Sequence, residues 1–251
     1  MPNDFLFWSL AILATLTVGA SKGGVPGVGI LAVPILAQVI SPVVAAGLLL
    51  PLLVLSDIYG LWLYRKNHDL WNIKIMVVAA TIGIAVGWAT ASYNSDDLVK
   101  IIVGVIGIWY SLDLYFKSDK ATAQKPADVP RGLFWGSLTG FTSFVAHAGG
   151  IPFQMYVLPQ RLDKMTFAGT ATIAFAIINL LKLPPYWFLG QINLESLETC
   201  LYLAPVALFG AWAGYRLTKI LPEKTFFKAV EIALVIVSVK LIWDGLASML
   251  V

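Results

Sequence analysis

The sequence has few charged residues. Asp, Glu, Lys and Arg make up 12% of its 251 residues, whereas hydrophobic residues make up 59%. Soluble domains have about 25% charged and about 45–50% apolar residues, so the composition excludes an ordinary soluble protein. Long uncharged runs recur along the chain, and the longer ones reach the roughly 17–25 residues that a helix needs to cross a bilayer. We therefore expect an all-α integral membrane protein.

Residues for redox, metal and enzyme chemistry are also scarce. Cys200 is the single cysteine, so it cannot form an internal disulfide, and His68 and His147 make no Cys/His metal spacing. The zinc motif H-E-x-x-H, the nucleophile elbow G-x-S-x-G and a Walker-type phosphate loop are missing. We therefore expect no enzyme, no catalytic residue, no metal and no cofactor. The formal charge of +3 fits basic loops better than nucleic-acid binding.

The apolar runs predict ten membrane segments. They cover residues 5–20, 28–40, 43–64, 73–93, 98–116, 132–147, 151–160, 165–183, 196–217 and 225–249. The one extended polar connection, residues 117–131, is rich in Lys, Asp, Gln and Pro, which is typical of an exposed linker. It separates a first half, residues 1–116, from a second half, residues 132–251. Each half then holds five segments.

The two halves share a short pattern. A glycine pair, an apolar residue and a proline occupy residues 23–26 and again residues 149–152, and a basic residue, Lys22 or His147, stands just before each copy. Further equivalent positions are Gly47 and Asp57 with Gly169 and Asn179, and the G-x-x-x-G pairs Gly83–Gly87 and Gly210–Gly214. The last two pairs have the spacing that lets helix backbones approach closely. We interpret the halves as structural repeats.

The segments beside each glycine pair are short. The seventh, residues 151–160, cannot cross a bilayer as a helix. We interpret the first and second segments, and the sixth and seventh, as half-helices that meet at a glycine break. With three full crossings after each pair, one face of the membrane receives 13 of the 17 basic residues. These are Arg65, Lys66, Lys74, Lys117, Lys120, Lys125, Arg131, Arg161, Lys164, Arg216, Lys219, Lys224 and Lys228.

That bias orients the chain. By the positive-inside rule the basic face is cytoplasmic, both termini lie outside, and the linker 117–131 is cytoplasmic. The opposite face keeps Lys100 and Lys182. An odd number of reversals in each half means that the second repeat is inverted relative to the first. We expect a multi-pass protein of the cell (inner) membrane, and the first apolar segment stays because residues 1–6 carry no Lys or Arg.

Inverted repeats with broken helices are the architecture of secondary transporters, in which the breaks form the substrate site. A half-helix that starts at Pro26 or Pro152 would leave glycine amides and the positive end of the helix dipole in the gap, which favours an anion. Lys22 adds a full positive charge and His147 a titratable one. The predicted ligand is a small anion held by Lys22, His147 and the amides of Gly23, Gly24, Gly149 and Gly150.

The chain resembles the TauE/SafE sulfite exporters, also called the toluene sulfonate uptake permease family. The resemblance covers the whole chain and rests on its length, its two-fold repeat and the glycine pair with its proline in each half. It implies movement of sulfur-containing anions, such as sulfite and organosulfonates, across the cell membrane. Many members have three glycines in a row, whereas this chain has Lys22 and Ala148 before its glycine pairs.

Other polar residues in the apolar segments have two interpretations each. Asp57 is either a proton carrier or counter-ion of Lys22, or else a structural hydrogen-bonding group. Inversion brings Asn179 toward it, and Asn179 is a candidate substrate-binding residue. His147 is a candidate for proton coupling, or a packing residue. Ser21 and Gln154 are candidates to donate hydrogen bonds to sulfonate oxygens, although such side chains often bond to backbone or neighbouring helices. Lys22 either binds the anion or extends to the membrane surface.

The sequence thus predicts a secondary transporter in the lipid bilayer that alternates access to a central anion site, with Asp57 and His147 as the candidates for proton coupling. A passive anion channel would use the same basic breaks. A carrier of another small organic anion, such as a carboxylate, is the second alternative. No nucleic acid is expected as a partner, and the oligomeric state stays open.

Overall fold

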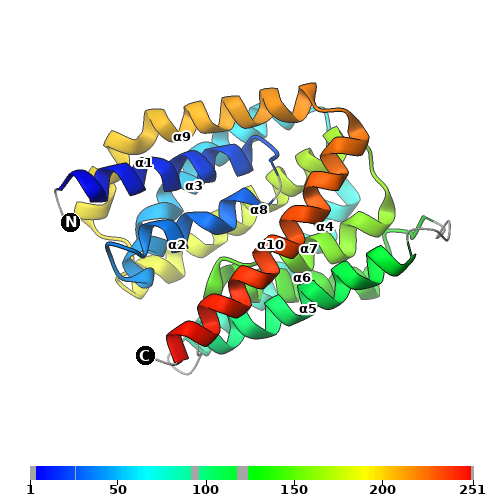
Figure 1. Cartoon of the computed structure of the whole chain (residues 1–251), viewed down its shortest axis with the longest axis horizontal. Helices are drawn as coiled ribbons and strands as arrows, with labels where there is room; N and C mark the ends of the chain where they lie inside the picture. Colours follow the sequence, from blue (N-terminus) through cyan, green and yellow to red (C-terminus); the bar gives the residue numbers. More distant parts are fainter. Residues whose placement is uncertain (1–3, 26, 92–95, 118–123, 250–251) are drawn as a thin grey trace. The chain divides into compact units, whose positions relative to one another are not determined.

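A computed structural model describes residues 4–25, 27–91, 96–117 and 124–249. Its described elements are all helical (Figure 1). They are α1 (Phe5–Lys22), η1 (Val28–Leu31), α2 (Ala32–Leu36), α3 (Pro42–Tyr64), α4 (Leu70–Ala89), α5 (Asp96–Lys117), α6 (Val129–Ala146), α7 (Gly150–Val157), η2 (Leu158–Gln160), α8 (Lys164–Phe188), α9 (Leu194–Ile220) and α10 (Glu223–Met249). The prediction of an all-α protein is confirmed for these residues.

Five of the described helices are long and apolar enough to cross a bilayer. They are α1, residues 43–64 of α3, α4, α8 and residues 196–220 of α9. Four helices begin at a polar side chain that accepts a hydrogen bond from the first helical turn, which satisfies a backbone amide that would otherwise lack a partner. These caps are Asp4, Ser41, Asp128 and Asn193.

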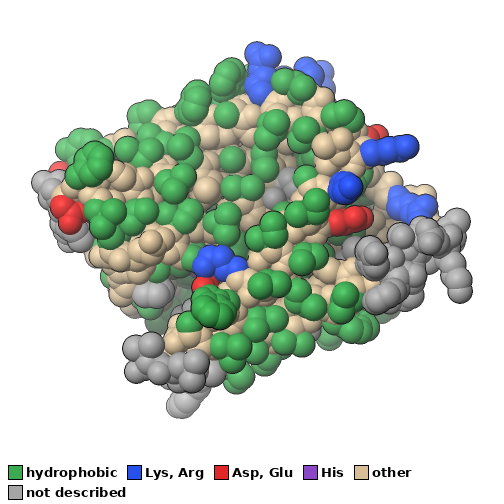
Figure 2. All heavy atoms as spheres, in the orientation of Figure 1, with side chains coloured by type: hydrophobic (Ala, Val, Ile, Leu, Met, Phe, Trp, Pro, Cys, Tyr) green, Lys and Arg blue, Asp and Glu red, His purple; other side chains and the backbone are tan. Residues whose placement is uncertain are grey.

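The outward faces of several helices are apolar. Figure 2 shows hydrophobic side chains along α9 and α10. The exposed ones include Leu201, Phe209, Trp212, Ile220, Ile232, Ile236, Val239 and Trp243. Such surfaces are unfavourable in water and favourable in hydrocarbon. The structure is therefore that of a multi-pass membrane protein.

The chain forms two compact units that each combine helices from before and after residues 117–131. Unit 1 contains residues 1–69 and 164–222, and unit 2 contains residues 70–163 and 223–251. Unit 1 thus holds α1, α2, α3, α8 and α9, and unit 2 holds α4, α5, α6, α7 and α10. Neither unit is built from one half of the sequence alone.

In unit 1, α1 packs along α9 and α3 packs along α8. Small residues allow the first contact, because a Cβ atom on Gly19 would lie 2.2 Å from the Ala207 carbonyl oxygen and one on Gly214 would lie 2.4 Å from the Ala20 carbonyl oxygen. Backbones that approach this closely have no room for a larger side chain. The expected role of the pair Gly210–Gly214 in helix packing is confirmed.

In unit 2, α4 packs along α6 and α5 packs along α10. A Cβ atom on Gly83 would lie 1.9 Å from the Ser137 carbonyl oxygen, and one on Gly140 would lie 2.1 Å from that of Ala80. The pair Gly83–Gly87 therefore serves the same kind of close contact as its counterpart in unit 1.

Both predicted breaks interrupt the helices. The helix α7 begins at Gly150 and has 8 residues, which at 1.5 Å per residue is about 12 Å and too short to cross a bilayer. Pro152 lies in its first turn, as predicted. In the first half, α1 ends at Lys22 and the chain continues as η1 and the 5-residue α2. The predicted start at Pro26 lies outside the described residues.

One segment is longer than predicted. The expected segment 165–183 holds Lys182 near its end, whereas α8 continues to Phe188 and buries Lys182 with 1% of its surface exposed. The sequence segment ended at residue 183, just before Pro184 and Pro185. Prolines usually end a helix, but α8 includes both.

Candidate functional site

Three charged side chains are buried in the described part of the chain: Lys22, Asp57 and Lys182. All three belong to unit 1, where they lie on α1, α3 and α8. Ionised groups inside a membrane protein are costly unless they are paired, so these three residues are the candidate functional site. We call Lys22, Asp57, Asn179 and Lys182 the charged cluster.

The centre of the charged cluster is an ion pair between α1 and α3. The Lys22 Nζ atom lies 2.8 Å from Asp57 Oδ1, and both side chains are buried. The ammonium also lies 5.7 Å from the centroid of the Phe175 ring on α8, a distance at which the ring face attracts a cation. Lys22 therefore does not extend to the membrane surface. The sequence analysis named Asp57 as a candidate counter-ion of Lys22, and the structure contains that ion pair.

The helix α8 contributes one face to the charged cluster. Phe175, Asn179 and Lys182 are spaced by four and three residues, which places them on the same side of a helix. Asn179 donates a hydrogen bond of 2.8 Å from Nδ2 to Asp57 Oδ2. Asp57 therefore holds groups from two other helices, one through each carboxylate oxygen.

Lys182 completes the charged cluster. Its charge interacts with those of Lys22 and Asp57, and its Nζ lies 5.6 Å from the centroid of the Tyr186 ring one helical turn further on. A buried lysine that is released from its carboxylate partner can pair with an anionic ligand.

The turn after Lys22 is fixed by side chains of three other helices. The Gly23 carbonyl oxygen accepts hydrogen bonds from the Tyr64 hydroxyl at 2.7 Å and the Thr218 hydroxyl at 3.3 Å. The Lys22 carbonyl oxygen accepts one from the Thr172 hydroxyl at 3.3 Å. These bonds satisfy carbonyls that the end of α1 leaves without helical partners, and so hold Lys22 in place.

The glycine amides of this turn already have partners. Gly23 N donates to the Gly19 carbonyl at 2.9 Å and Gly24 N donates to the Ser21 carbonyl at 3.1 Å. Gly24 has a φ of +98°, the left-handed conformation that glycine adopts easily at a helix end. The Ser21 hydroxyl donates to the Val18 carbonyl at 2.7 Å. In this structure these groups complete α1, and the positive charge of the turn comes from Lys22.

The other predicted site residues belong to unit 2. His147 ends α6 with a φ of +51°, and Gly149 is the N-cap of α7 without a side-chain cap. At the start of α7, the Ile151 amide donates to the Ala148 carbonyl at 3.4 Å and the Phe153 amide donates to the Gly149 carbonyl at 3.2 Å, while Pro152 has no N–H. Gln154 is buried, and its Oε1 has no hydrogen-bond partner.

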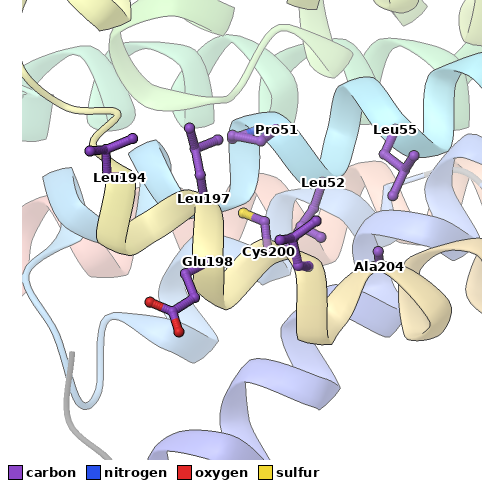
Figure 3. Close-up of a pocket in the computed structure, with 9 residues that line it drawn as sticks. Pro51, Leu52, Leu55, Leu194, Leu197, Glu198, Cys200 and Ala204 are labelled. Carbon is purple, nitrogen blue, oxygen red and sulfur yellow. The ribbon is translucent and has the colours of Figure 1, made fainter.

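An apolar groove of about 440 Å³ lies between α3 and α9 in unit 1 (Figure 3). It is lined by Pro51, Leu52, Leu55, Leu194, Leu197, Glu198, Cys200, Leu201 and Ala204. Glu198 is the one charged residue of this lining. The groove offers an anion no positive charge, so it does not compete with the charged cluster as the candidate site. The described residues contain no group of three or more His, Cys, Asp or Glu placed to hold a metal ion.

Sequence reasoning found three members of the charged cluster and missed Lys182. The spacing of Phe175, Asn179 and Lys182 was the signal that could have found it, because it places Lys182 on the same helical face as Asn179 inside the expected segment 165–183. The double proline obscured that signal.

Comparisons with known proteins identify the family. The family model of the sulfite exporter TauE/SafE matches residues 11–241 of the 251. Neither the search of curated proteins nor the search of solved structures gave a match. The family match covers both glycine breaks and the whole charged cluster. This chain therefore belongs to the TauE/SafE sulfite exporter family of membrane transport proteins.

Proposed function

We propose that the protein is a secondary transporter that moves a small sulfur-containing anion, of the sulfite or organosulfonate type, across the cell membrane. The charged cluster carries this proposal. Lys22 is buried and forms an ion pair of 2.8 Å with Asp57. A buried lysine binds an anion when its carboxylate partner is neutralised or displaced, because a charge in the membrane interior needs a counter-charge.

The architecture we propose is a pair of inverted repeats, residues 1–116 and 132–251, joined by the cytoplasmic linker 117–131. Three contacts between α3 and α8 support it. Asp57 and Asn179, which the sequence places at equivalent positions, bond to one another. A Cβ atom on Gly47 would meet the Gln191 carbonyl just after α8, and one on its equivalent Gly169 would meet the Asn67 carbonyl just after α3. Reciprocal contacts of this kind are expected around a two-fold axis.

The packing of the other helices agrees with the same repeat. The helix α1 packs along α9, and the equivalent helices by chain order are α6 and α4, which also pack along one another. Each repeat thus contributes two helices to the unit that contains the glycine break of the other: α4 and α5 belong to unit 2, and α8 and α9 belong to unit 1. Inverted repeats with broken helices are the framework in which secondary transporters alternate access to their site.

Proton coupling is proposed for Asp57. When Asp57 takes up a proton, the ion pair with Lys22 is lost and the ammonium is released to bind substrate more strongly. The break of the second repeat, with His147, Gly149, Gly150 and Gln154, is proposed to contribute to anion binding as the sequence predicts. We place the protein in the inner membrane with both termini outside because the basic loops then face the cytoplasm.

A passive channel for the same anions is the alternative function. The two are distinguished by flux in proteoliposomes. A carrier saturates with substrate concentration and exchanges labelled for unlabelled substrate, whereas the conductance of a pore rises linearly with concentration and shows no counterflow.

Substitution of Lys22 tests the site. Purified wild-type protein is titrated with sulfite, methanesulfonate, thiosulfate and acetate, and binding is measured from the rise in melting temperature that a ligand of the folded state causes. Lys22→Met is expected to abolish that rise for every anion. Lys240→Met is the matched control, because Lys240 forms an ion pair of similar length, 2.9 Å, with Asp244 on α10 outside the charged cluster.

The control is expected to bind anions like the wild-type protein. If Lys22→Met retains the wild-type affinity, the anion does not bind at Lys22 and the proposal is wrong. A stronger response to acetate than to the sulfur anions would instead assign the site to carboxylates.

A further inference from the structure

We propose that Phe175 is a positioning residue of the charged cluster: its ring keeps the Lys22 ammonium at the site while Asp57 carries a proton, so that the ammonium is in place to bind the anion. This inference rests on the proposed function, because it concerns how the same site passes from its ion pair to its ligand. It gives a role to a side chain that has no charge and no hydrogen-bonding group.

Groups from two different helices contact the Lys22 ammonium in unit 1. Its Nζ atom lies 2.8 Å from Asp57 Oδ1 on α3 and 5.7 Å from the centroid of the Phe175 ring on α8. The Lys22 side chain is 7% exposed, so water solvates the ammonium little. When the negative charge of Asp57 is lost, the ring remains beside the ammonium.

Lys22 needs such a partner because its ammonium is buried. A lysine has a flexible four-carbon side chain, and an unpaired ammonium inside a membrane protein extends toward water. Protonation of Asp57 removes the negative charge that faces Lys22, so without another partner the ammonium would leave its position between α3 and α8. An anion would then have to draw it back in order to bind, which lowers affinity.

An aromatic ring suits this role because it attracts a cation without neutralising it. The negative face of the ring attracts the ammonium, and the attraction is stronger where water is excluded. A second carboxylate in the same place would compete with the anion for the positive charge of Lys22, whereas the ring has no net charge. An ammonium held by Phe175 therefore keeps its full charge for the ligand.

The helix α8 fixes the ring relative to Lys22. Thr172, Phe175 and Asn179 are spaced by three and four residues, so they lie on one face of α8. Thr172 donates to the Lys22 carbonyl oxygen at 3.3 Å, and Asn179 donates to Asp57 Oδ2 at 2.8 Å. The Thr172 bond does not involve Asp57, so it keeps α8 beside Lys22 when the ion pair is lost.

The test measures the effect of the ring with and without the carboxylate charge. Dissociation constants for methanesulfonate are obtained by calorimetry at neutral pH on the purified full-length protein in lipid nanodiscs. Phe175→Leu keeps an apolar side chain without a ring. While Asp57 is present it is expected to bind within about threefold of the wild-type protein, because the ion pair still holds Lys22.

The Asp57→Asn background shows the ring where it matters most. Asp57→Asn/Phe175→Leu is expected to bind methanesulfonate about tenfold more weakly than Asp57→Asn alone, a difference of about 1.4 kcal/mol. Asp57→Asn/Phe175→Tyr restores a ring and is expected to recover the affinity of Asp57→Asn. A residue that only fills space would have the same effect in both backgrounds, so the double-mutant cycle separates positioning from packing.

Phe7→Leu is the matched control. Phe7 is a fully buried phenylalanine at the other end of α1 from Lys22, so its replacement is expected to change affinity equally in the two backgrounds. Circular dichroism and the monomer peak in size exclusion establish that each variant is folded.

A pH series keeps the inference testable if Asp57→Asn does not fold. The ratio of the dissociation constants of Phe175→Leu and the wild-type protein is expected to rise in acidic buffer, as Asp57 takes up a proton. Lys182, whose charge also acts on Asp57, is present in both proteins, so the comparison is made at equal composition. A ratio that stays constant with pH would overturn the inference.

The outcomes separate this inference from the proposed function. If ring removal has the same effect with and without the Asp57 charge, or if Phe175→Tyr restores nothing, Phe175 does not position Lys22 and the inference is overturned, although anion binding itself still supports the site. If the wild-type protein binds neither methanesulfonate, sulfite nor thiosulfate, the proposed function fails and this inference fails with it.

Discussion

Unit 1 and unit 2 have the same kinds of helix contact but bury different chemistry. Unit 1 buries Lys22, Asp57 and Lys182, whereas the buried polar side chains described in unit 2 are neutral. The clearest of these are Asn72 and Gln160, whose amides exchange two hydrogen bonds of 2.8 and 3.0 Å. Both units therefore join distant segments through polar pairs, and buried charge is what distinguishes unit 1, which contains the candidate site.

The helices of the two units also differ in where their prolines lie. Those of unit 1 contain interior prolines, Pro51 in α3, Pro184 and Pro185 in α8 and Pro205 in α9. In unit 2, the prolines described in helices are confined to first turns, at Pro130 of α6 and Pro152 of α7. Each interior proline removes a backbone hydrogen bond and makes its helix easier to bend. Charge and bendable helices thus occur together around the candidate site.

The largest effect on stability is expected from Asp57→Ala. It leaves Lys22 and Lys182 buried without their carboxylate, so the free energy of unfolding should fall by about 3–5 kcal/mol. Denaturant titration in mixed micelles measures the change. Lys22→Met in the same chain should restore most of the loss, because only one buried cation then remains. No recovery would mean that the pair is not the origin of the effect.

Substitution of a glycine at a helix contact should lower the free energy of unfolding by a similar amount in the two units. Gly19→Ala in unit 1 and Gly83→Ala in unit 2 each place a Cβ atom against a backbone oxygen, at 2.2 and 1.9 Å. Overpacking of this kind should cost up to about 3 kcal/mol in either unit. Ile12→Ala, at an exposed position of α1, is the control with little expected effect. A large cost in one unit alone would show that only that unit depends on close helix packing.

Asn72→Leu tests the neutral pair of unit 2. It removes both hydrogen bonds to Gln160 and leaves that buried amide without its partner, so the expected loss of stability is about 2 kcal/mol. Methanesulfonate affinity should be unchanged, because the charged cluster belongs to unit 1. Altered affinity in a folded Asn72→Leu protein would contradict the assignment of binding to unit 1.

The smallest effects are expected from two tyrosines with parallel roles. The Tyr64 hydroxyl donates to the Gly23 carbonyl at 2.7 Å in unit 1, and the Tyr156 hydroxyl donates to the Asp128 carbonyl at 3.1 Å in unit 2. Replacement of either by Phe should cost about 1 kcal/mol. Tyr64→Phe should in addition weaken anion binding because it loosens the turn that carries Lys22, and equal binding in both variants would argue against that positioning role.

The sequence predicted the helices well because membrane segments need long apolar runs and breaks need glycine and proline. It also predicted that Asn179 approaches Asp57, from the proposal that the two residues hold equivalent positions in inverted repeats. It missed the path of α8 through Pro184 and Pro185. Neighbouring helices support a proline inside a membrane helix, and such support is not visible in a single sequence.

The sequence also did not predict which helices form each compact unit. Periodicity identifies a helix but not the helix that it packs against, so only the structure shows that α1 packs along α9 and α4 along α6. The sequence analysis expected the amides of Gly23 and Gly24 to be free to hold an anion. Whether they are free depends on the direction that the chain takes after Lys22, which the sequence does not give. The structure uses those amides to end α1.

Counterflow of labelled sulfite tests the central claim most directly. Proteoliposomes loaded with unlabelled sulfite and diluted into a trace of labelled sulfite report exchange through a carrier. We predict transient accumulation of label with the wild-type protein and with Lys240→Met, and none with folded Lys22→Met. Wild-type counterflow by Lys22→Met would contradict the claim that the buried lysine of α1 holds the transported anion.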